Sequence, residues 1–221
     1  MSFFRKKSKE EFSYYDGGEI KERRICLNGK WEGEYISYYE NGQIMVNLNY
    51  RNGLREGDAV SYYENGQIRE KGIFENDKLE GEYISYYENG RIMEKENYRD
   101  GKLAGEYILY YENGRIKDQE NFKNGKFDGE YISYYKGGQI KEKGKFKEDK
   151  RGGEYISYYK NGRVKEMARY KGGELDGEFI GYTEDGRRLE VSGGLDLHDE
   201  YELDTYENLL RKLKSFDEEE R

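Results

Sequence analysis

The sequence of 221 residues contains no proline, one cysteine, one histidine and one tryptophan. A single cysteine, Cys26, forms no intramolecular disulfide, which suits a reducing compartment. The absence of proline is typical of strands whose N–H groups all donate to neighbouring strands. No apolar stretch approaches the roughly 20 residues of a membrane-spanning helix, and residues 1–12 contain bases but no apolar signal-peptide segment. These absences predict a cytoplasmic protein without a transmembrane segment.

Residues that carry catalytic chemistry are scarce. His198 lies beside Asp196 and Asp199, but a general base needs an oriented partner and a pocket, and one histidine with two aspartates is too sparse for a metal site. The glycines lie in predicted hairpins rather than between a strand and a helix, so they form no phosphate cradle. We therefore expect no catalytic residue, no cofactor, no metal and no enzymatic activity.

The chain instead contains 25 tyrosines and a stretch, Gly33 to Ile44, that recurs every 24 residues. A fixed period in this range indicates a repeat architecture. The leading glycines are Gly33, Gly57, Gly81, Gly105, Gly129, Gly153 and Gly177, and the turn glycines are Gly18, Gly42, Gly66, Gly90, Gly114, Gly138, Gly162 and Gly186. About eight such units account for most of the chain.

Each unit contains two aromatic runs separated by Asn-Gly, as at Asn41-Gly42, which predicts a hairpin with a two-residue type I′ turn. The opposite end, as at Asn52-Gly53, is expected to be a looser loop. This register places Tyr39 opposite Ile44, Tyr35 opposite Leu48 and Gly33 opposite Tyr50. The unit is therefore interpreted as strand, tight turn, strand, looser turn.

Alternation along the strands divides the side chains between two faces. Tyr35, Tyr50 and the leading glycines share one face, which we expect to be the packed one, with Cys26 in the column of Tyr50. An aromatic side chain lying over a strand glycine covers exposed backbone, so Gly105→Val should bring a bulky side chain against Phe122. The other face carries Tyr38 and its equivalents, flanked by lysines such as Lys71, Lys95 and Lys143.

The sequence thus predicts an all-β protein, an elongated open antiparallel meander of 24-residue β-hairpin repeats with a short C-terminal α-helical cap. We divide it into a lead-in at 1–12, a repeat domain at 13–192 and an acidic tail at 193–221. Asp204 and Glu207 resemble a capping box, and an amphipathic helix is expected at about 205–216. The apolar face of this cap or docking helix consists of Tyr206, Leu209, Leu210, Leu213 and Phe216.

The charge of −8 belongs mainly to the tail, where residues 196–221 contain ten acids and four bases. The repeats are nearly neutral, which argues against a nucleic-acid partner. One acidic column changes sign from Glu112 to Lys136 and Lys160, which is either solvated surface pairing or a charge pattern that sets the register of a partner. A tyrosine-lined surface favours a protein partner, and the candidate binding residues are Tyr62, Tyr86, Tyr110, Tyr134, Tyr158, Glu82, Glu106 and Glu130.

The unit G-E-Y-I-S-Y-Y-E-N-G-Q-I-x-E-K, followed by an aromatic residue and N-G-K, resembles the MORN-repeat variant of bacterial YwqK-family antitoxins over about residues 13–190. The resemblance implies an open meander, no enzymatic activity and neutralisation of a cognate toxin. It supplies no catalytic residue. Two hypotheses follow: a protein-binding antitoxin or immunity protein, and a structural scaffold or adaptor for self-assembly or attachment to membrane or envelope. We expect a monomer or weak self-association through the sheet edges.

Overall fold

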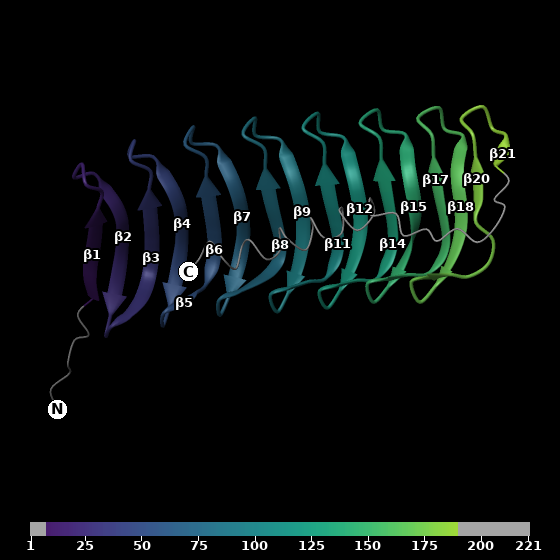
Figure 1. The fold of residues 1–221 in the computed structure, drawn as a ribbon. Helices are drawn as coiled ribbons and strands as arrows, with labels where there is room; N and C mark the ends of the chain where they lie inside the picture. Colours follow the sequence, from purple (N-terminus) through teal and green to yellow (C-terminus); the bar gives the residue numbers. More distant parts are fainter. Residues whose placement is uncertain (1–7, 190–221) are drawn as a thin grey trace. The chain divides into compact units, whose positions relative to one another are not determined.

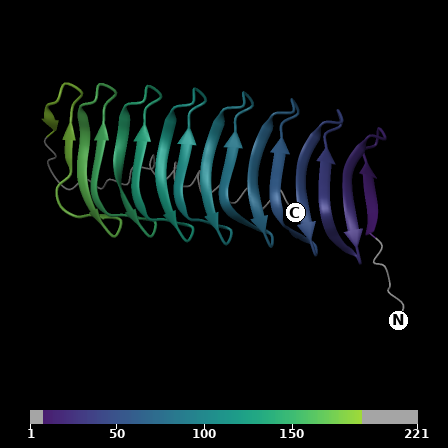
Figure 2. The same cartoon turned by 180° about the vertical axis from the view of Figure 1, so that it is seen from behind.

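The computed structural model describes residues 8–189, which fold into one antiparallel sheet of 21 strands. The strands lie side by side in chain order as a single layer (Figures 1 and 2). The predicted all-β antiparallel meander is confirmed. The expected helix at 205–216, with Tyr206, Leu209, Leu210, Leu213 and Phe216, lies outside the described residues.

Each repeat contributes a long ascending strand, a long descending strand and, in most units, a two-residue strand between hairpins. The first strands of the hairpins are β1 (Ser8–Tyr14), β3 (Lys30–Tyr38), β6 (Gly57–Tyr62), β8 (Lys78–Tyr86), β11 (Gly105–Tyr110), β14 (Gly129–Tyr134), β17 (Gly153–Tyr158) and β20 (Ile180–Tyr182). The second strands are β2 (Ile20–Leu27), β4 (Ile44–Arg51), β7 (Ile68–Glu75), β9 (Ile92–Arg99), β12 (Ile116–Lys123), β15 (Ile140–Lys147) and β18 (Val164–Lys171). The short strands between hairpins are β5 (Leu54–Arg55), β10 (Lys102–Leu103), β13 (Lys126–Phe127), β16 (Lys150–Arg151) and β19 (Glu174–Leu175). The second strand of the last hairpin is β21 (Arg188–Leu189).

The turn types at the two hairpin ends are the reverse of those expected. Tyr39 N–H donates to Gln43 O at 2.8 Å and Gly42 N–H donates to Tyr39 O at 2.9 Å, so the loop has three residues. Gly42 has a φ of 82° and Asn41 is not at positive φ, which corresponds to a type I turn followed by a glycine bulge. The expected two-residue turn at Asn41-Gly42 is therefore wrong.

The two-residue type I′ turns lie at the opposite end of each unit. Asn52 and Gly53 have φ of 55° and 87° between the paired residues Arg51 and Leu54. Asn tolerates this left-handed conformation because its short polar side chain can hydrogen-bond locally. What lengthens this end is a bulge after the turn, at Glu56 and Gly57, where the leading glycine has a φ of 85°.

The register away from the turns agrees with the sequence prediction. Gly33 pairs with Tyr50 and Tyr35 with Leu48. A register shift between Ser37 and Tyr38 then places Tyr38, and not Tyr39, opposite Ile44. A bulge of this kind shifts only the residues between it and the turn, so the division into two faces survives.

One face of the sheet contains nearly all the buried aromatic side chains, and we call it the packed face. Its buried hydrophobic residues are Leu103, Tyr107, Phe122, Phe127, Tyr131, Tyr155 and Ala168. The rings contact across repeats: Phe127 lies 5.2 Å from Phe122 and 4.2 Å from Phe146 between ring centroids, both edge-on. Each such aromatic pair stabilises the fold by about 0.5–1.5 kcal/mol more than the burial of its surface area alone. The core is therefore a row of rings, and each repeat covers its neighbour.

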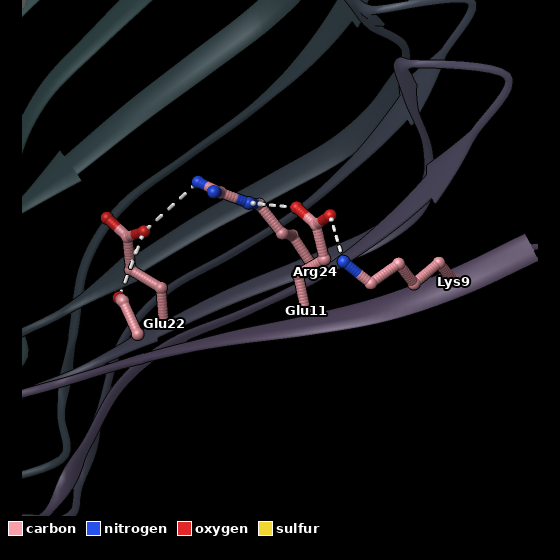
Figure 3. Close-up of polar contacts among 5 residues, drawn as sticks. Lys9, Glu11, Glu22 and Arg24 are labelled. Atoms are coloured by element: carbon pink, nitrogen blue, oxygen red, sulfur yellow. Dashed lines mark hydrogen bonds and ion pairs between the residues drawn. The ribbon is translucent and has the colours of Figure 1, made fainter.

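The first strand begins inside the segment expected as a lead-in, and its packed-face residues are charged rather than aromatic. Arg24 Nε lies 3.3 Å from Glu11 Oε2, while Lys9 Nζ lies 3.1 Å from Glu11 Oε1 (Figure 3). The Arg24 guanidinium also lies 5.2 Å from the Trp31 ring centroid. On the packed face, the row of aromatic rings is therefore followed by charged side chains at the first strand. Charged residues on an edge strand disfavour pairing with a strand of another chain.

Candidate protein-binding surface

The face opposite the packed face carries one tyrosine from each hairpin, at the end of its first strand. We call these the outer tyrosines, and the face the tyrosine face. In the second to eighth hairpins they are Tyr38, Tyr62, Tyr86, Tyr110, Tyr134, Tyr158 and Tyr182, all half-buried, and the equivalent Tyr14 of the first hairpin is 59% exposed. The sequence-predicted residues Tyr62, Tyr86, Tyr110, Tyr134 and Tyr158 are thus in one column, with part of each ring accessible.

The predicted carboxylate residues lie on the same face, nearer the opposite end of the strands. Glu82, Glu106 and Glu130 are all exposed and lie opposite Asn97, Asn121 and Lys145. Isoleucines fill the position between the acid and the tyrosine in most hairpins, and Ile84 is 5% exposed. The sheet therefore brings tyrosine, isoleucine and glutamate together in a band that repeats from hairpin to hairpin.

Lysine stems flank the outer tyrosines, as the sequence predicts. The Lys71 ammonium lies 5.8 Å from the centroid of the Tyr86 ring, within the range of a cation–π interaction. Lys95 and Lys143 pair with Ile84 and Ile132 in the neighbouring column. The tyrosine face is thus an amphipathic surface in which rings and aliphatic stems alternate with charges.

The second tyrosine of each Tyr-Tyr pair has a different role, which sequence reasoning missed. Its hydroxyl donates to the main-chain carbonyl of the outer tyrosine in the next unit, at 2.6–2.8 Å. We call these donors the bridging tyrosines: Tyr15, Tyr39, Tyr63, Tyr87, Tyr111, Tyr135 and Tyr159. The invariance of both tyrosines in every pair up to Tyr158-Tyr159 was the available signal.

Asparagine at the three-residue turn adds a second connection between hairpins. Asn41 Oδ1 accepts from Gln43 N–H at 2.9 Å, which fixes the turn. Its Nδ2 donates to Glu64 O at 3.5 Å in the next hairpin. The equivalent Asn161 donates to Glu184 O at 3.3 Å. The loops at this end are thereby held in a regular row, which makes the adjoining tyrosine face a rigid surface.

Carboxylates on the packed face were also missed, because the expectation was a purely aromatic side. Ser61 Oγ donates to Glu70 at 3.2 Å, and the pattern recurs at Ser157 and Glu166, also at 3.2 Å. Tyr155 donates to Glu142 at 2.8 Å. Their sequence signal was an acid two residues after the isoleucine or valine that follows each turn. These groups are structural, since each is satisfied inside the packed face.

Burial on the packed face shifts several pKa values. Desolvation, followed by the charge of Glu22, raises the pKa of Tyr35 to about 12. Desolvation, reinforced by Asp118, raises the pKa of Glu120 to about 8. The register places Glu120 opposite Tyr107, which is 4% exposed. Burial disfavours the charged form of a carboxyl group, so Glu120 is mainly protonated at neutral pH.

Within residues 8–189 no group of three or more His, Cys, Asp or Glu side chains is arranged to hold a metal ion. His198, with Asp196 and Asp199, lies outside the described residues. Cys26 is half-buried and pairs with Trp31 in the aromatic column.

Among the described residues there is no helix long and apolar enough to span a membrane.

Comparison with solved structures gives two distant likenesses. A chain of the TcdB2-TccC3-Cdc42 complex is 12% identical over 83% of this chain and 12% of its own length, with a TM-score of 0.23. A protein of unknown function from Bacteroides fragilis NCTC 9343 is 11% identical over 75% of this chain and 93% of its own, with a TM-score of 0.14. The chain thus spans about an eighth of the first structure, and both TM-scores are too low to bear on fold or function.

A search of curated proteins finds no match. The repeats themselves match the family described as MORN repeat variant in six consecutive segments, 31–52, 55–76, 79–100, 103–124, 127–148 and 151–171. These segments make up more than half of the chain and have the 24-residue spacing of the hairpins. The chain therefore belongs to the MORN repeat variant family.

Proposed function

We propose that this protein is a non-catalytic binding protein whose tyrosine face contacts a protein partner. Repeats of this family are generally protein- or membrane-binding. The observation that supports the proposal most directly is the division between the two tyrosines of each pair. The hydroxyl of the bridging tyrosine connects neighbouring repeats. The outer tyrosine takes part in these bridges only through its main-chain carbonyl, so its side chain is not used in them.

The chemistry of the tyrosine face suits a protein partner. Tyrosine supplies a large rigid contact area with few rotamers, and tyrosine and arginine are enriched where binding energy concentrates. The outer tyrosines are partly buried before binding, so less side-chain entropy is lost on association. Glu82, Glu106 and Glu130 at the rim of the tyrosine column add polar groups that fix orientation.

We further propose that the partner is a toxin that this protein neutralises by direct contact. This finer proposal rests on the resemblance of the repeat unit to the YwqK-family antitoxins. A rigid surface without catalytic residues is suited to inhibiting a toxin by covering its active surface.

The test is capture of a partner by the immobilised full chain from the cytosol of its source. The unaltered chain should retain one stoichiometric protein, and the variant with Tyr86→Thr, Tyr110→Thr and Tyr134→Thr should lose it. Threonine keeps the β-forming character of these positions. The matched control is Tyr87→Phe, which removes one bridge and should still retain the partner.

The antitoxin part of the proposal is tested by expressing the captured partner alone and together with this chain. Growth arrest by the partner that is relieved by the unaltered chain, and not by the threonine variant, is the expected result. A partner that leaves growth unaffected would contradict the antitoxin proposal. Retention of the partner by the threonine variant would contradict the binding surface itself.

End-to-end assembly through the sheet edges is the competing proposal. At the first edge, β1 carries Lys9, Glu10 and Glu11, and the Lys9 side chain is 76% exposed. Charges of this kind disfavour edge-to-edge pairing. Light scattering that shows larger particles with rising protein concentration would support assembly, whereas a constant monomer mass would exclude it.

A further inference from the structure

Exposed charge is distributed unevenly along the repeats. In hairpins 33–51, 57–75, 81–99 and 105–123 the exposed charged residues are seven bases and eight acids, a net charge of −1. In hairpins 129–147 and 153–171 they are ten bases and two acids, a net charge of +8. The ten bases are Lys136, Lys141, Lys143, Lys145, Lys147, Lys160, Arg163, Lys165, Arg169 and Lys171. These two neighbouring hairpins therefore carry a net positive charge that the four earlier hairpins lack.

The sign change at the turn column belongs to the same feature. Glu112 ends the acidic run, and Lys136 and Lys160 follow it at the equivalent positions of these two hairpins. We call the ten exposed bases of these two hairpins the basic patch. Ion pairing between surface side chains, the alternative explanation of the sign change, does not neutralise this patch. Three of the ten bases form ion pairs: Lys145 with Glu130 at 2.9 Å, Lys147 with Asp128 at 3.1 Å and Lys165 with Glu166 at 3.2 Å. Lys143 and Lys171 have no ion pair within the described part of the chain.

The basic patch includes the tyrosine face. Lys143 lies opposite Ile132, and Lys145 and Arg169 lie opposite Glu130 and Glu154. An incoming group would thus meet lysine and arginine beside the half-buried rings of Tyr134 and Tyr158.

The acids that remain in the patch help to choose between anionic partners. Glu130 and Glu154 are exposed on the same face and recur in each hairpin. A uniformly charged phosphate backbone would be repelled at both positions, whereas a protein segment can place a base or a neutral residue there. Base stacking on single strands also requires a groove whose charge is positive throughout.

We propose that hairpins 129–147 and 153–171 bind an acidic segment of the protein partner, so that charge fixes where along the sheet the partner docks. This inference rests on the proposed function, because it assigns the partner's chemistry at one part of the same tyrosine face. Complementary charge sets register and speeds encounter more than it adds affinity. The neutral hairpins before residue 129 then contact the rest of the partner without selecting it by charge.

The test measures binding of a fluorescein-labelled oligo-glutamate peptide to the full chain at low salt by fluorescence anisotropy. The variant with Lys143→Glu and Lys171→Glu is compared with Lys71→Glu and Lys123→Glu, which reverse two exposed lysines at equivalent positions of earlier hairpins. We expect about a tenfold loss of affinity in the first pair and little change in the second. Single-stranded oligothymidylate and phosphatidylserine vesicles serve as the other anionic probes.

Equal losses in both variant pairs would overturn the location of the site. Binding of the oligonucleotide or the vesicles as tight as that of the peptide would overturn the assignment to an acidic protein segment. A captured partner that both lysine variants retain alike refutes this inference and leaves the proposed function intact. Peptide binding with the expected loss, but without any captured protein, contradicts the proposed function instead.

Discussion

At the level of single residues, the two adjacent tyrosines of each pair have different roles, because the first ends a strand and the second lies just beyond it, where the turn begins. Tyr86 presents its ring on the tyrosine face, while Tyr87 crosses to the main-chain carbonyl of Tyr110 at 2.6 Å. The acceptor in each bridge is a main-chain atom. Substitution of an outer tyrosine therefore leaves the bridge to it in place.

The Tyr111→Phe variant removes one bridge, the 2.7 Å hydrogen bond from Tyr111 to Tyr134 O, with little change in shape. We expect the free energy of unfolding to fall by about 0.5–1.5 kcal/mol, the usual net value of a hydrogen bond. Urea denaturation followed by tyrosine fluorescence measures it. Tyr110→Phe is the control. An equal loss of unfolding free energy in Tyr110→Phe would show that the bridging hydrogen bond does not contribute to stability.

Glu120 gives the protein a pH dependence of known sign. Its pKa is about 8 in the folded chain and near 4.3 when unfolded, so between these values the folded state binds more protons. Stability is then highest below the unfolded pKa and declines as the pH rises through about 8. Glu120→Gln should flatten this decline and stabilise the protein by about 1–3 kcal/mol at alkaline pH.

Denaturation of the parent and of Glu120→Gln across this pH range is the measurement. The neighbouring Asp118, whose pKa burial also raises, contributes a smaller decline that both proteins share. Identical pH profiles would mean that Glu120 is solvated and ionised in the folded state.

At the level of the element, the hairpin ends decide where the side chains point. The leading glycine of each unit lies in a bulge, and Gly105 has a φ of 103°, a conformation that residues with a Cβ rarely adopt. A Cβ at Gly105 would meet Asn97 Cβ at 3.7 Å. The expected collision of Gly105→Val with Phe122 is therefore wrong, and the reason for instability is the backbone.

Gly105→Val should accordingly lower the free energy of unfolding by about 1–3 kcal/mol, the cost of a strained backbone conformation. Gly152→Ala is the matched control, since Gly152 precedes the equivalent bulge, is not at positive φ and has open space around its Cβ position. Thermal unfolding of both variants checks the prediction. A Gly105→Val protein that melts with the parent would contradict the bulge assignment.

The sequence determines the pairing of the strands but not the turn types. The 24-residue period and the alternation at Tyr35 and Tyr50 were enough to predict the faces and the Gly33–Tyr50 pair. Asn-Gly is compatible with both a two-residue and a three-residue loop, and at Asn41-Gly42 the three-residue loop contains a 2.9 Å hydrogen bond from Gln43 N–H to Asn41 Oδ1. The buried acid Glu96 was not predictable from periodicity, because its position is Gly72 and Gly144 in other units; in the structure it accepts a hydrogen bond from the Tyr98 hydroxyl at 2.6 Å.

At the level of the whole molecule, the hydrogen bonds between units join neighbouring repeats throughout residues 8–189, so stability should accumulate from unit to unit. Deleting residues 105–128 removes one full 24-residue period and lets Tyr87 reach Tyr134 O in place of Tyr110 O. We expect a folded, cooperative sheet with a lower melting temperature. Deleting only residues 105–116 breaks the phase and should abolish folding, as judged by circular dichroism.

The central claim is that packing and binding belong to different tyrosines. The most direct measurement compares two triple variants, Tyr86, Tyr110 and Tyr134→Thr against Tyr87, Tyr111 and Tyr135→Phe, in thermal unfolding and in capture of the partner. We predict that the phenylalanine variant melts earlier and retains the partner, whereas the threonine variant stays folded and loses it. Loss of the partner from the phenylalanine variant while it is folded, with retention by the threonine variant, would contradict the account.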